Sequence, residues 1–187
     1  TKVLETGADL GISFDGDADR AGFVDEKGAA VGNDLTTALI AGELLEAAPG
    51  KAVVYDLRSS RAVAEYIAEH GGRPIRERVG HSFIKATMRE VGAPFAGELS
   101  GHFYFAENFT TDSGVLAMVT ALNFLGAEEN RGRTLSEHVA ELRRYHSTGE
   151  VDFRVADPEA AIAELASTYA DGRQDRKDGI TVEYGDL

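Results

Sequence analysis

The 187-residue sequence contains no cysteine, and its 19 lysines and arginines are far outnumbered by 32 aspartates and glutamates. The absence of cysteine excludes disulfides and thiolate metal sites and is compatible with a cytoplasmic protein, which we expect. Because the net charge is −13, we expect neither nucleic acid nor an anionic membrane surface as a partner. No apolar run approaches the roughly 20 residues that span a bilayer, so we expect no membrane segment.

Methionine is scarce as well. The first residue is Thr1, and the only methionines are Met88 and Met118. This pattern predicts that the sequence is part of a longer protein, whose function is then incomplete in these residues.

The hydrophobic pattern predicts an α/β fold. Two short strands at 8–14 and 20–25 flank an acidic loop, and a helix capped by Asn33 or Asp34 extends to about Ala48. Strands and helices then alternate with short connections, which predicts a parallel sheet with right-handed crossovers. The alternating segments are strand 51–57, helix 59–72, strand 73–79, helix 81–92 and strand 94–99.

The remaining segments complete this pattern and then restart it. An aromatic strand is expected at 102–109, an apolar helix capped by Asp112 to about Leu125, and an amphipathic helix at 134–145. A second set follows, with a strand at 150–155, a helix after Asp157-Pro158 and a last strand at 181–187. We place domain boundaries near residues 30 and 146.

Polar residues gather where the predicted parallel strands end. Open α/β sheets bind ligands at the carboxyl ends of their strands, and those ends carry Arg58, His81, Glu98, Ser100 and His102. Serines after the strands, Ser59 or Ser60 and Ser82, are expected to cap the following helices, whose free N–H groups favour anions. Each residue alone is explained equally well as a cap or as polar surface. The prediction therefore depends on the polar residues of the three strand ends taken together.

The segment "DGDADR" places Asp15, Asp17 and Asp19 at alternate positions of one loop. Three carboxylates about 5 Å apart repel one another by roughly 3 kcal/mol per pair at an effective dielectric constant near 20. A divalent cation offsets this repulsion, and a set of oxygen ligands suits Mg²⁺. The alternative is a solvated acidic turn in which the side chains point apart.

Two other known sites share part of this spacing. An EF-hand loop that begins at Asp15 would place Glu26 correctly at its last ligand position, but it requires glycine where Arg20 stands. Phosphatases with an aspartyl nucleophile place threonine or valine where Asp19 stands. Neither site fits the sequence well.

Three motifs together carry a resemblance to a family. The segments "DGDADR" (15–20), "GHSFIK" (80–85) and "GELSGH" (97–102), in this order, resemble the α-D-phosphohexomutases of the phosphomannomutase/phosphoglucomutase branch. The resemblance extends from about residue 8 to residue 125. It implies a mixed, largely parallel sheet flanked by helices. It also implies that residues 1–30 end the second of four domains, that residues 31–146 form the third and that residues 147–187 begin the fourth.

The resemblance also implies roles for individual residues. Asp15, Asp17 and Asp19 would bind Mg²⁺ together with a phosphoserine of another domain, and Arg20 would hold the transferring phosphoryl group. His81 would lie near the reacting hydroxyl and exchange a proton with it. The substrate-binding residues implied by the family motifs are Arg58, His81, Gly97, Glu98, Ser100 and His102. Lys85 either reaches the cleft or is only a solvated residue on the surface of its helix.

The activity implied by the family is the interconversion of hexose 1-phosphate and hexose 6-phosphate through a phosphoserine and a 1,6-bisphosphate. The segment 97–102 matches the loop with which the family binds the sugar, here called the sugar loop. Leu99 in this loop favours mannose and glucose phosphates over glucosamine phosphate. No Ser-His-Asn-Pro segment occurs in the sequence, so we expect these residues alone to be inactive and the missing domains to be their partners. The rival hypothesis is a non-catalytic module that binds a sugar phosphate or Ca²⁺.

Overall fold

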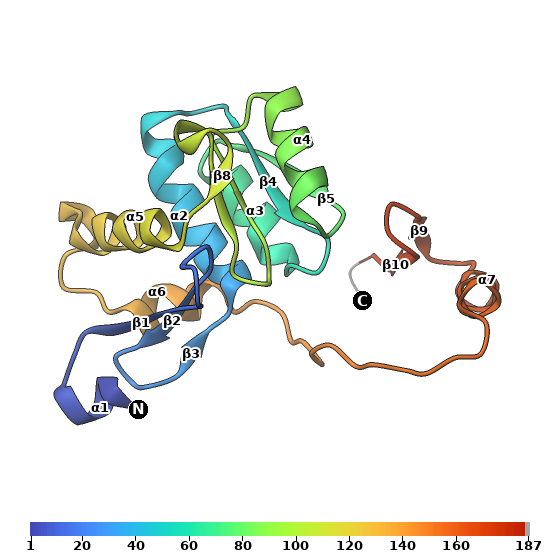
Figure 1. Ribbon diagram of the computed structural model, residues 1–187, viewed down its shortest axis with the longest axis horizontal. Coiled ribbons are helices and arrows are strands. Elements are labelled where there is room, and N and C mark those ends of the chain that lie inside the picture. The colour runs from blue at the N-terminus through green and yellow to red at the C-terminus, as the bar shows by residue number, and fades with distance from the viewer. Residues whose placement is uncertain (186–187) are drawn as a thin grey trace. The chain divides into compact units, whose positions relative to one another are not determined.

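The computed structural model describes residues 1–185. The chain divides into two compact units, Thr1–His146 and a smaller one that starts at Ser147 (Figure 1). The last two residues of the predicted strand 181–187 lie outside the described residues. Within the described range, no helix is both long enough and apolar enough to cross a membrane.

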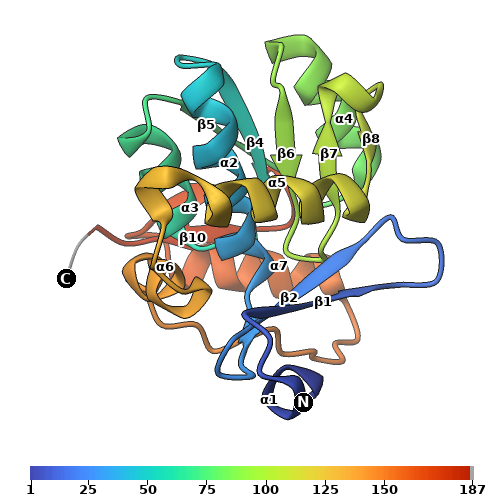
Figure 2. The ribbon, with the colours of Figure 1, turned by 90° about the vertical axis from the view of Figure 1, so that its left-hand side faces the viewer.

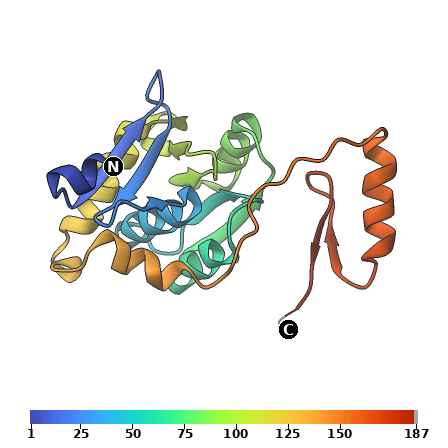
Figure 3. The ribbon, with the colours of Figure 1, turned by 90° about the horizontal axis from the view of Figure 1, so that it is seen from below.

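The first unit begins with α1 (Lys2–Thr6) and a three-stranded antiparallel sheet. Its strands are β1 (Leu10–Phe14), β2 (Ala21–Asp25) and β3 (Ala30–Val31). Phe14 pairs with Ala21 at the end of the β1–β2 hairpin, so the acidic loop 15–20 closes that hairpin, and the predicted strand–loop–strand arrangement is confirmed. The hairpin lies beside α5 (Gly114–Gly126) (Figure 3).

A five-stranded mixed sheet forms the centre of this unit, in the order β5-β4-β6-β7-β8. The first three strands are parallel, as the alternating pattern predicts, and the last two are antiparallel. The strands are β4 (Ala52–Asp56), β5 (Arg73–Glu77), β6 (Phe95–Gly97), β7 (Phe103–Phe105) and β8 (Thr111–Asp112). The helices around the sheet are α2 (Asn33–Ala47), α3 (Arg61–Glu69), α4 (His81–Val91), α5 and α6 (Leu135–Leu142), with 3₁₀ turns at Ala106–Asn108 and Glu128–Asn130.

Alternating side chains of the strands pack against helices on both faces of this sheet. Val53 and Phe95 face the core shared with α2, α3, α5 and α6, whereas Val54 and Ala96 face α4. Figure 2 shows α5 crossing in front of β6 and β7, with α4 behind the sheet. Because both faces are covered, β4 is buried along its whole length, as expected for a central parallel strand.

Two predicted helix caps are wrong, because a glycine occupies the N-cap position of each helix. The helix expected to start at Asn33 or Asp34 is capped by Gly32, and Asp34 instead accepts a hydrogen bond from the Ser60 N–H group at 3.1 Å. Ser82 lies within α4, which starts after Gly80. Gly80 has φ +125°, a conformation that side chains rarely adopt.

A third cap is also displaced by one residue. Ser113, rather than Asp112, caps α5 by accepting a hydrogen bond from the Leu116 N–H group at 3.2 Å. Asp112 belongs to β8 and is thereby free to contact the candidate site. The predicted cap at Ser60 is confirmed, since its hydroxyl accepts from the Ala62 N–H group at 3.3 Å.

The second unit contains α7 (Pro158–Thr168) and a hairpin of β9 (Arg173–Asp175) and β10 (Thr181–Glu183). Asp157 caps α7 as predicted, accepting from the Ala160 N–H group at 3.0 Å. The strand predicted at 150–155 is not formed. Its apolar residues are exposed, with 80% of Phe153 accessible, because no neighbouring strand among the described residues pairs with this segment, and a strand needs such pairing.

Glu26 connects the β2–β3 turn to the start of α6. Its carboxylate accepts hydrogen bonds from the backbone N–H group and from the hydroxyl of Ser136, the former at 3.2 Å. Partial burial raises the pKa of Glu26, but the hydrogen bonds from Ser136 outweigh it and lower the pKa to about 2 from 4.5. The ionised form is therefore stabilised in the folded protein.

We predict that Glu26→Gln lowers the free energy of unfolding at pH 7 by about 1–2 kcal/mol, because the charge-assisted hydrogen bonds are lost. Since the folded pKa lies below the unfolded value, the wild-type advantage is present above pH 4.5 and disappears as the pH falls towards 2. Urea denaturation at several pH values measures this difference.

The matched control is Glu90→Gln at an exposed position of α4, which should change the free energy by less than about 0.5 kcal/mol. A Glu26→Gln effect that is equal at all pH values would contradict the assignment.

Candidate active site

The acidic loop brings its three carboxylates together. Asp15, Asp17 and Asp19 each offer an oxygen, and these oxygens lie within 4.8 Å of one another. The loop bends at Ala18, which adopts a left-handed backbone conformation with φ +60°, unusual for a residue other than glycine. The side chains therefore converge, and the alternative of carboxylates that point apart does not hold.

Asp19 holds an oxygen that the surrounding protein leaves unsatisfied. Its Oδ1 atom is buried and has no hydrogen-bond partner among the described residues. Burial raises the pKa of Asp19; the nearby His102 opposes this, and the negative charges of Asp15 and Asp17 reinforce it. An unpaired buried acceptor among three carboxylates is a fitting environment for a hard dication such as Mg²⁺.

Arg20 is fixed against the same loop. Its Nε atom donates to Asp15 Oδ2 at 2.7 Å, and its backbone N–H group donates to Asp15 Oδ1 at 3.2 Å. Desolvation acts to raise the pKa of Asp15, but these hydrogen bonds prevail and lower it. Half of the Arg20 side chain remains exposed, so donors of its guanidinium are available to an anionic ligand.

The loop 97–102, which follows β6, is shaped by its own hydrogen bonds. The Glu98 N–H group donates to the His102 carbonyl at 2.9 Å, and the Gly101 N–H group donates to the Glu98 carbonyl at 3.0 Å. The buried Glu98 carboxylate accepts from the Tyr104 hydroxyl. Burial, then this hydrogen bond, raises the pKa of Tyr104, which therefore remains a neutral donor to Glu98.

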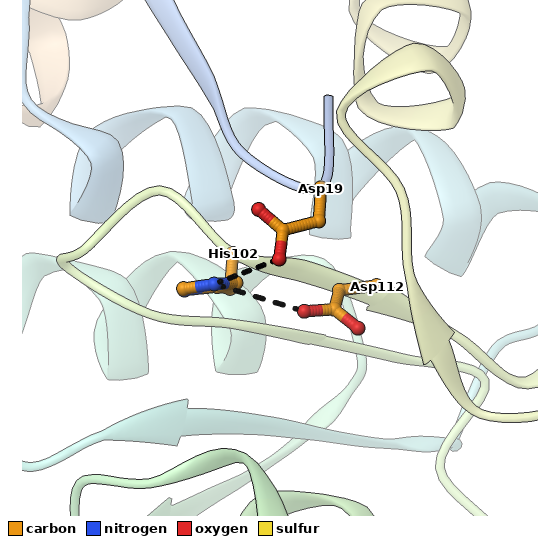
Figure 4. A group of neighbouring side chains, drawn as sticks. All are labelled: Asp19, His102 and Asp112. Carbon is orange, nitrogen blue, oxygen red and sulfur yellow. Dashed lines mark ion pairs between the residues drawn. The ribbon is translucent and has the colours of Figure 1, made fainter. Parts of the chain in front are cut away.

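His102 joins the loop 97–102 to the acidic loop. Its Nε2 atom lies 3.6 Å from Asp19 Oδ2 and 3.8 Å from Asp112 Oδ2 (Figure 4), and its Nδ1 atom lies 3.0 Å from the Ser100 hydroxyl. The Lys85 ammonium reaches Asp112 Oδ1 at 3.1 Å, so Lys85 is not merely a solvated residue of its helix, and its contact with the cleft stays a prediction. Two motifs more than 80 residues apart thus share one site.

An open cavity of about 260 Å³ lies beside the acidic loop, and most of its lining comes from residues 13–22 of the β1–β2 hairpin. Asp15 and Arg20 line it together with Asn33 and Ser100. Charged donors and acceptors therefore face a space that admits a small polar ligand.

Arg58 is connected to the loop 97–102 through Asp56, whereas His81 stands apart from the acidic loop. Arg58 follows β4, and its Nη2 atom donates to Asp56 at 2.8 Å. His81 is an exposed residue that opens α4, and in the part of the chain that is described no hydrogen bond or ion pair links it to the acidic loop. Both nevertheless follow carboxyl ends of parallel strands, the edge at which the sequence placed them.

Gly97 has a packing explanation. A Cβ atom there would meet Thr37 Oγ1 at 2.1 Å. The absence of a side chain therefore allows α2 to approach β6, and the role in substrate binding that the motif implies for Gly97 stays a prediction.

Sequence reasoning missed three polar residues at this edge. The local sequence predicts Asp112 as a helix cap and Asn33 as an alternative cap, and Asp56 has no predicted role within the strand 51–57. The signal for Asp56 was present, since an acidic residue that ends a wholly apolar strand must find donors. No local pattern indicated Asp112, because its partners His102 and Lys85 lie elsewhere in the sequence.

Comparison with known proteins gives consistent matches. Residues 32–145 match the family model "Phosphoglucomutase/phosphomannomutase, alpha/beta/alpha domain III". Phosphomannomutase of Methanocaldococcus jannaschii is 42% identical over 181 residues, covering 96% of this chain and 39% of that protein. Phosphomannomutase/phosphoglucomutase of Pseudomonas syringae is 37% identical over 188 residues, covering 98% of this chain and 40% of that protein.

A solved structure shows the same fold. The chain is similar to a phosphoglucomutase/phosphomannomutase family protein from Burkholderia thailandensis, with a TM-score of 0.82 and 34% identity. The match covers 99% of this chain and 40% of that one. The chain thus spans about 40% of the length of the relatives it matches.

We predict that Gly114→Ala disturbs the acidic loop. The Gly114 N–H group donates to the Ala18 carbonyl at 3.0 Å, and a Cβ atom at 114 would lie 2.6 Å from the Arg20 carbonyl oxygen. Since backbone must move, we expect unfolding to become easier by about 1–3 kcal/mol, with altered amide resonances at residues 15–20. Thermal denaturation and amide NMR spectra measure the two effects.

Gly126→Ala at the other end of α5 is the control, because no atom lies within 4 Å of the added Cβ atom. It should be neutral or stabilise by up to about 1 kcal/mol. Equal destabilisation by both substitutions would mean that position 114 does not support the loop.

Proposed function

The chain belongs to the phosphoglucomutase/phosphomannomutase family. We propose that it is the part of a phosphohexomutase that carries the metal-binding loop, which is the acidic loop 15–20, and the sugar loop 97–102. The complete enzyme interconverts hexose 1-phosphate and hexose 6-phosphate, with mannose, glucose or both as the sugar. The observation that supports this most strongly is the convergence of the acidic loop with the loop 97–102 at His102, 3.6 Å from Asp19. The relatives' names support the substrate class.

The proposed division of labour follows the arrangement of the segments. Residues 1–30 end the second domain with the metal loop, residues 31–146 form the third domain with the sugar loop, and residues 147–187 begin the fourth. The phosphoserine and the rest of the phosphate site come from parts of the protein beyond these residues. The reaction passes through a hexose 1,6-bisphosphate.

The acidic loop is proposed to hold Mg²⁺ through Asp15, Asp17 and Asp19. When bound, the ion neutralises negative charge on the phosphoryl group in transfer. Asp15 has a second task in this scheme, because its two oxygens orient the Arg20 side chain and backbone. Arg20 then presents its remaining guanidinium donors to the phosphoryl oxygens.

The loop 97–102 is proposed to bind the hydroxyls of the sugar ring. The Tyr104 hydroxyl donates a hydrogen bond to the Glu98 carboxylate and so fixes its orientation. The remaining lone pairs of the carboxylate are then held in place to accept hydrogen bonds from the sugar. Ser100 and His102 contact each other and present a hydroxyl and an imidazole beside Glu98. Arg58 faces the substrate as a cation, and His81 exchanges a proton with the reacting hydroxyl.

We predict that the complete protein converts mannose 1-phosphate or glucose 1-phosphate to the 6-phosphate and that EDTA abolishes the conversion until Mg²⁺ is restored. The 187-residue chain alone should show no turnover, because it lacks the group that transfers the phosphoryl. A coupled assay for the hexose 6-phosphate measures both. A complete protein that is inactive on both sugars with Mg²⁺ present would overturn the proposal.

We also predict that Asp17→Asn weakens Mg²⁺ binding to the chain about tenfold or more, because one charged oxygen ligand is lost. Calorimetry on the wild type and the variant tests this, with the exposed Asp9→Asn as a control that should leave binding unchanged. Tight binding selective for Ca²⁺ would favour the rival hypothesis of a binding module. An unchanged affinity in Asp17→Asn would remove that residue from the site.

A further inference from the structure

We propose that Asp56 is a positioning residue that fixes Arg58 and the sugar loop 97–102 relative to each other, an inference that rests on the proposed function. Asp56 is the last residue of β4 and is fully buried, with 0% of its surface exposed. It does not line the cavity beside the acidic loop. Its effect on a ligand would therefore pass through the residues that it holds.

One oxygen of Asp56 connects the two loops directly. The Oδ2 atom accepts from Arg58 Nη2 at 2.8 Å, from Arg58 Nε at 3.2 Å and from the Leu99 N–H group at 3.0 Å. The first two bonds bring two donors of the guanidinium onto this one oxygen, and the third holds the middle of the sugar loop. A displacement of either partner therefore changes the bond that the other makes.

The second oxygen fixes the turn that carries Arg58. The Oδ1 atom accepts from the Arg58 N–H group at 3.1 Å, and from the N–H group and hydroxyl of Ser59 at 3.1 Å and 3.0 Å. Each oxygen thus accepts three hydrogen bonds. A carboxylate accepts on both oxygens, whereas an asparagine would place an NH₂ group against donors whichever way it turned.

The other side of the Leu99 peptide is held as well. The Asn33 side-chain amide donates to the Leu99 carbonyl at 3.1 Å, while Asp56 receives the Leu99 N–H group. Glu98 and Ser100, which are proposed to bind the sugar, directly flank this residue. Because β4 and β6 are adjacent, with Tyr55 paired to Gly97, the two loops leave neighbouring strand ends.

This arrangement sets the spacing between a cation and a pair of sugar-binding side chains before any ligand arrives. A hexose phosphate carries its phosphate and its ring hydroxyls at a fixed separation, so a preset spacing reduces the ordering that binding requires. We infer that this coupling favours a phosphorylated sugar whose phosphate and ring hydroxyls are both bound. Asp56 acts through Arg58 and Leu99 rather than by contact with the substrate.

The test is a double-mutant cycle in the complete protein, with Asp56→Asn and Arg58→Gln. Each single variant should lower kcat/KM for hexose 1-phosphate by about 10- to 100-fold, chiefly through a higher KM. If Asp56 acts through Arg58, the double variant should be within about threefold of the worse single variant. Multiplicative losses in the double variant would overturn the inference.

The control for general loss of stability is Asp25→Asn. Asp25 is also buried and accepts backbone N–H groups from Lys27 and Ala29, at 3.0 Å and 2.8 Å, in the turn that follows β2. It should lower the melting temperature but leave KM within about twofold of the wild type. An equal rise of KM in Asp25→Asn would show that burial of a carboxylate, and not the link to Leu99, determines the effect.

A second measurement applies if Asp56→Asn does not fold. Arg58→Gln in the 187-residue chain should shift the Leu99 amide resonance and speed its hydrogen exchange about tenfold or more, since both groups share Asp56 Oδ2. An unchanged Leu99 amide would contradict the coupling. A wild-type protein without mutase activity would instead contradict the proposed function, whatever the Leu99 amide shows.

Discussion

The structure of the candidate site depends on the backbone contact between the acidic hairpin loop and the end of the sugar loop. Arg20 pairs with His102 in an isolated antiparallel bridge, and the Ala21 N–H group donates to the Gly101 carbonyl at 3.1 Å. Through this contact a small antiparallel sheet and a mixed five-stranded sheet share one edge. The carboxylates of one loop and the imidazole of the other then lie side by side. Without this contact, the acidic loop would be an exposed hairpin turn, and its carboxylates would not lie next to His102.

Charge balance explains why the site still requires a cation. Arg20 compensates Asp15 at 2.7 Å and Lys85 compensates Asp112 at 3.1 Å, whereas the contacts of Asp19 to Arg20 and His102 are longer, at 3.7 Å and 3.6 Å. Asp17 forms no ion pair with any described residue, so negative charge in the loop stays uncompensated, and Asp19 Oδ1 also has no hydrogen-bond partner there. The surrounding protein fixes the ligands in advance, because Ala18 and Gly114 tie the loop to the start of α5. A preformed set of oxygens of this kind lowers the cost of binding a dication.

The order of the elements was predictable from the sequence because local signals specify it, whereas the roles predicted for the site residues stay predictions. Apolar strands such as 52–56 alternate with amphipathic helices, and the acidic loop stands between two strands. Other features depend on contacts with distant residues. Gly32 and Gly80, not the nearby polar residues, determine where α2 and α4 begin, and the segment 150–155 has the pattern of a strand without a strand to pair with. The bonds of Asp56 to Leu99 and of Lys85 to Asp112 join separate segments, so no local pattern could indicate them.

The central claim is that the acidic loop and the sugar loop form one site around one cation. Paramagnetic broadening by Mn²⁺, which prefers the same oxygen ligands as Mg²⁺, tests it most directly in the 187-residue chain. The account predicts that amide signals of residues 15–20 and 98–102 broaden together at low Mn²⁺. Signals of residues 128–130, beyond the far end of a helix about 20 Å long, should broaden much less. Broadening of the acidic loop while the signals of residues 98–102 stay sharp would contradict the account.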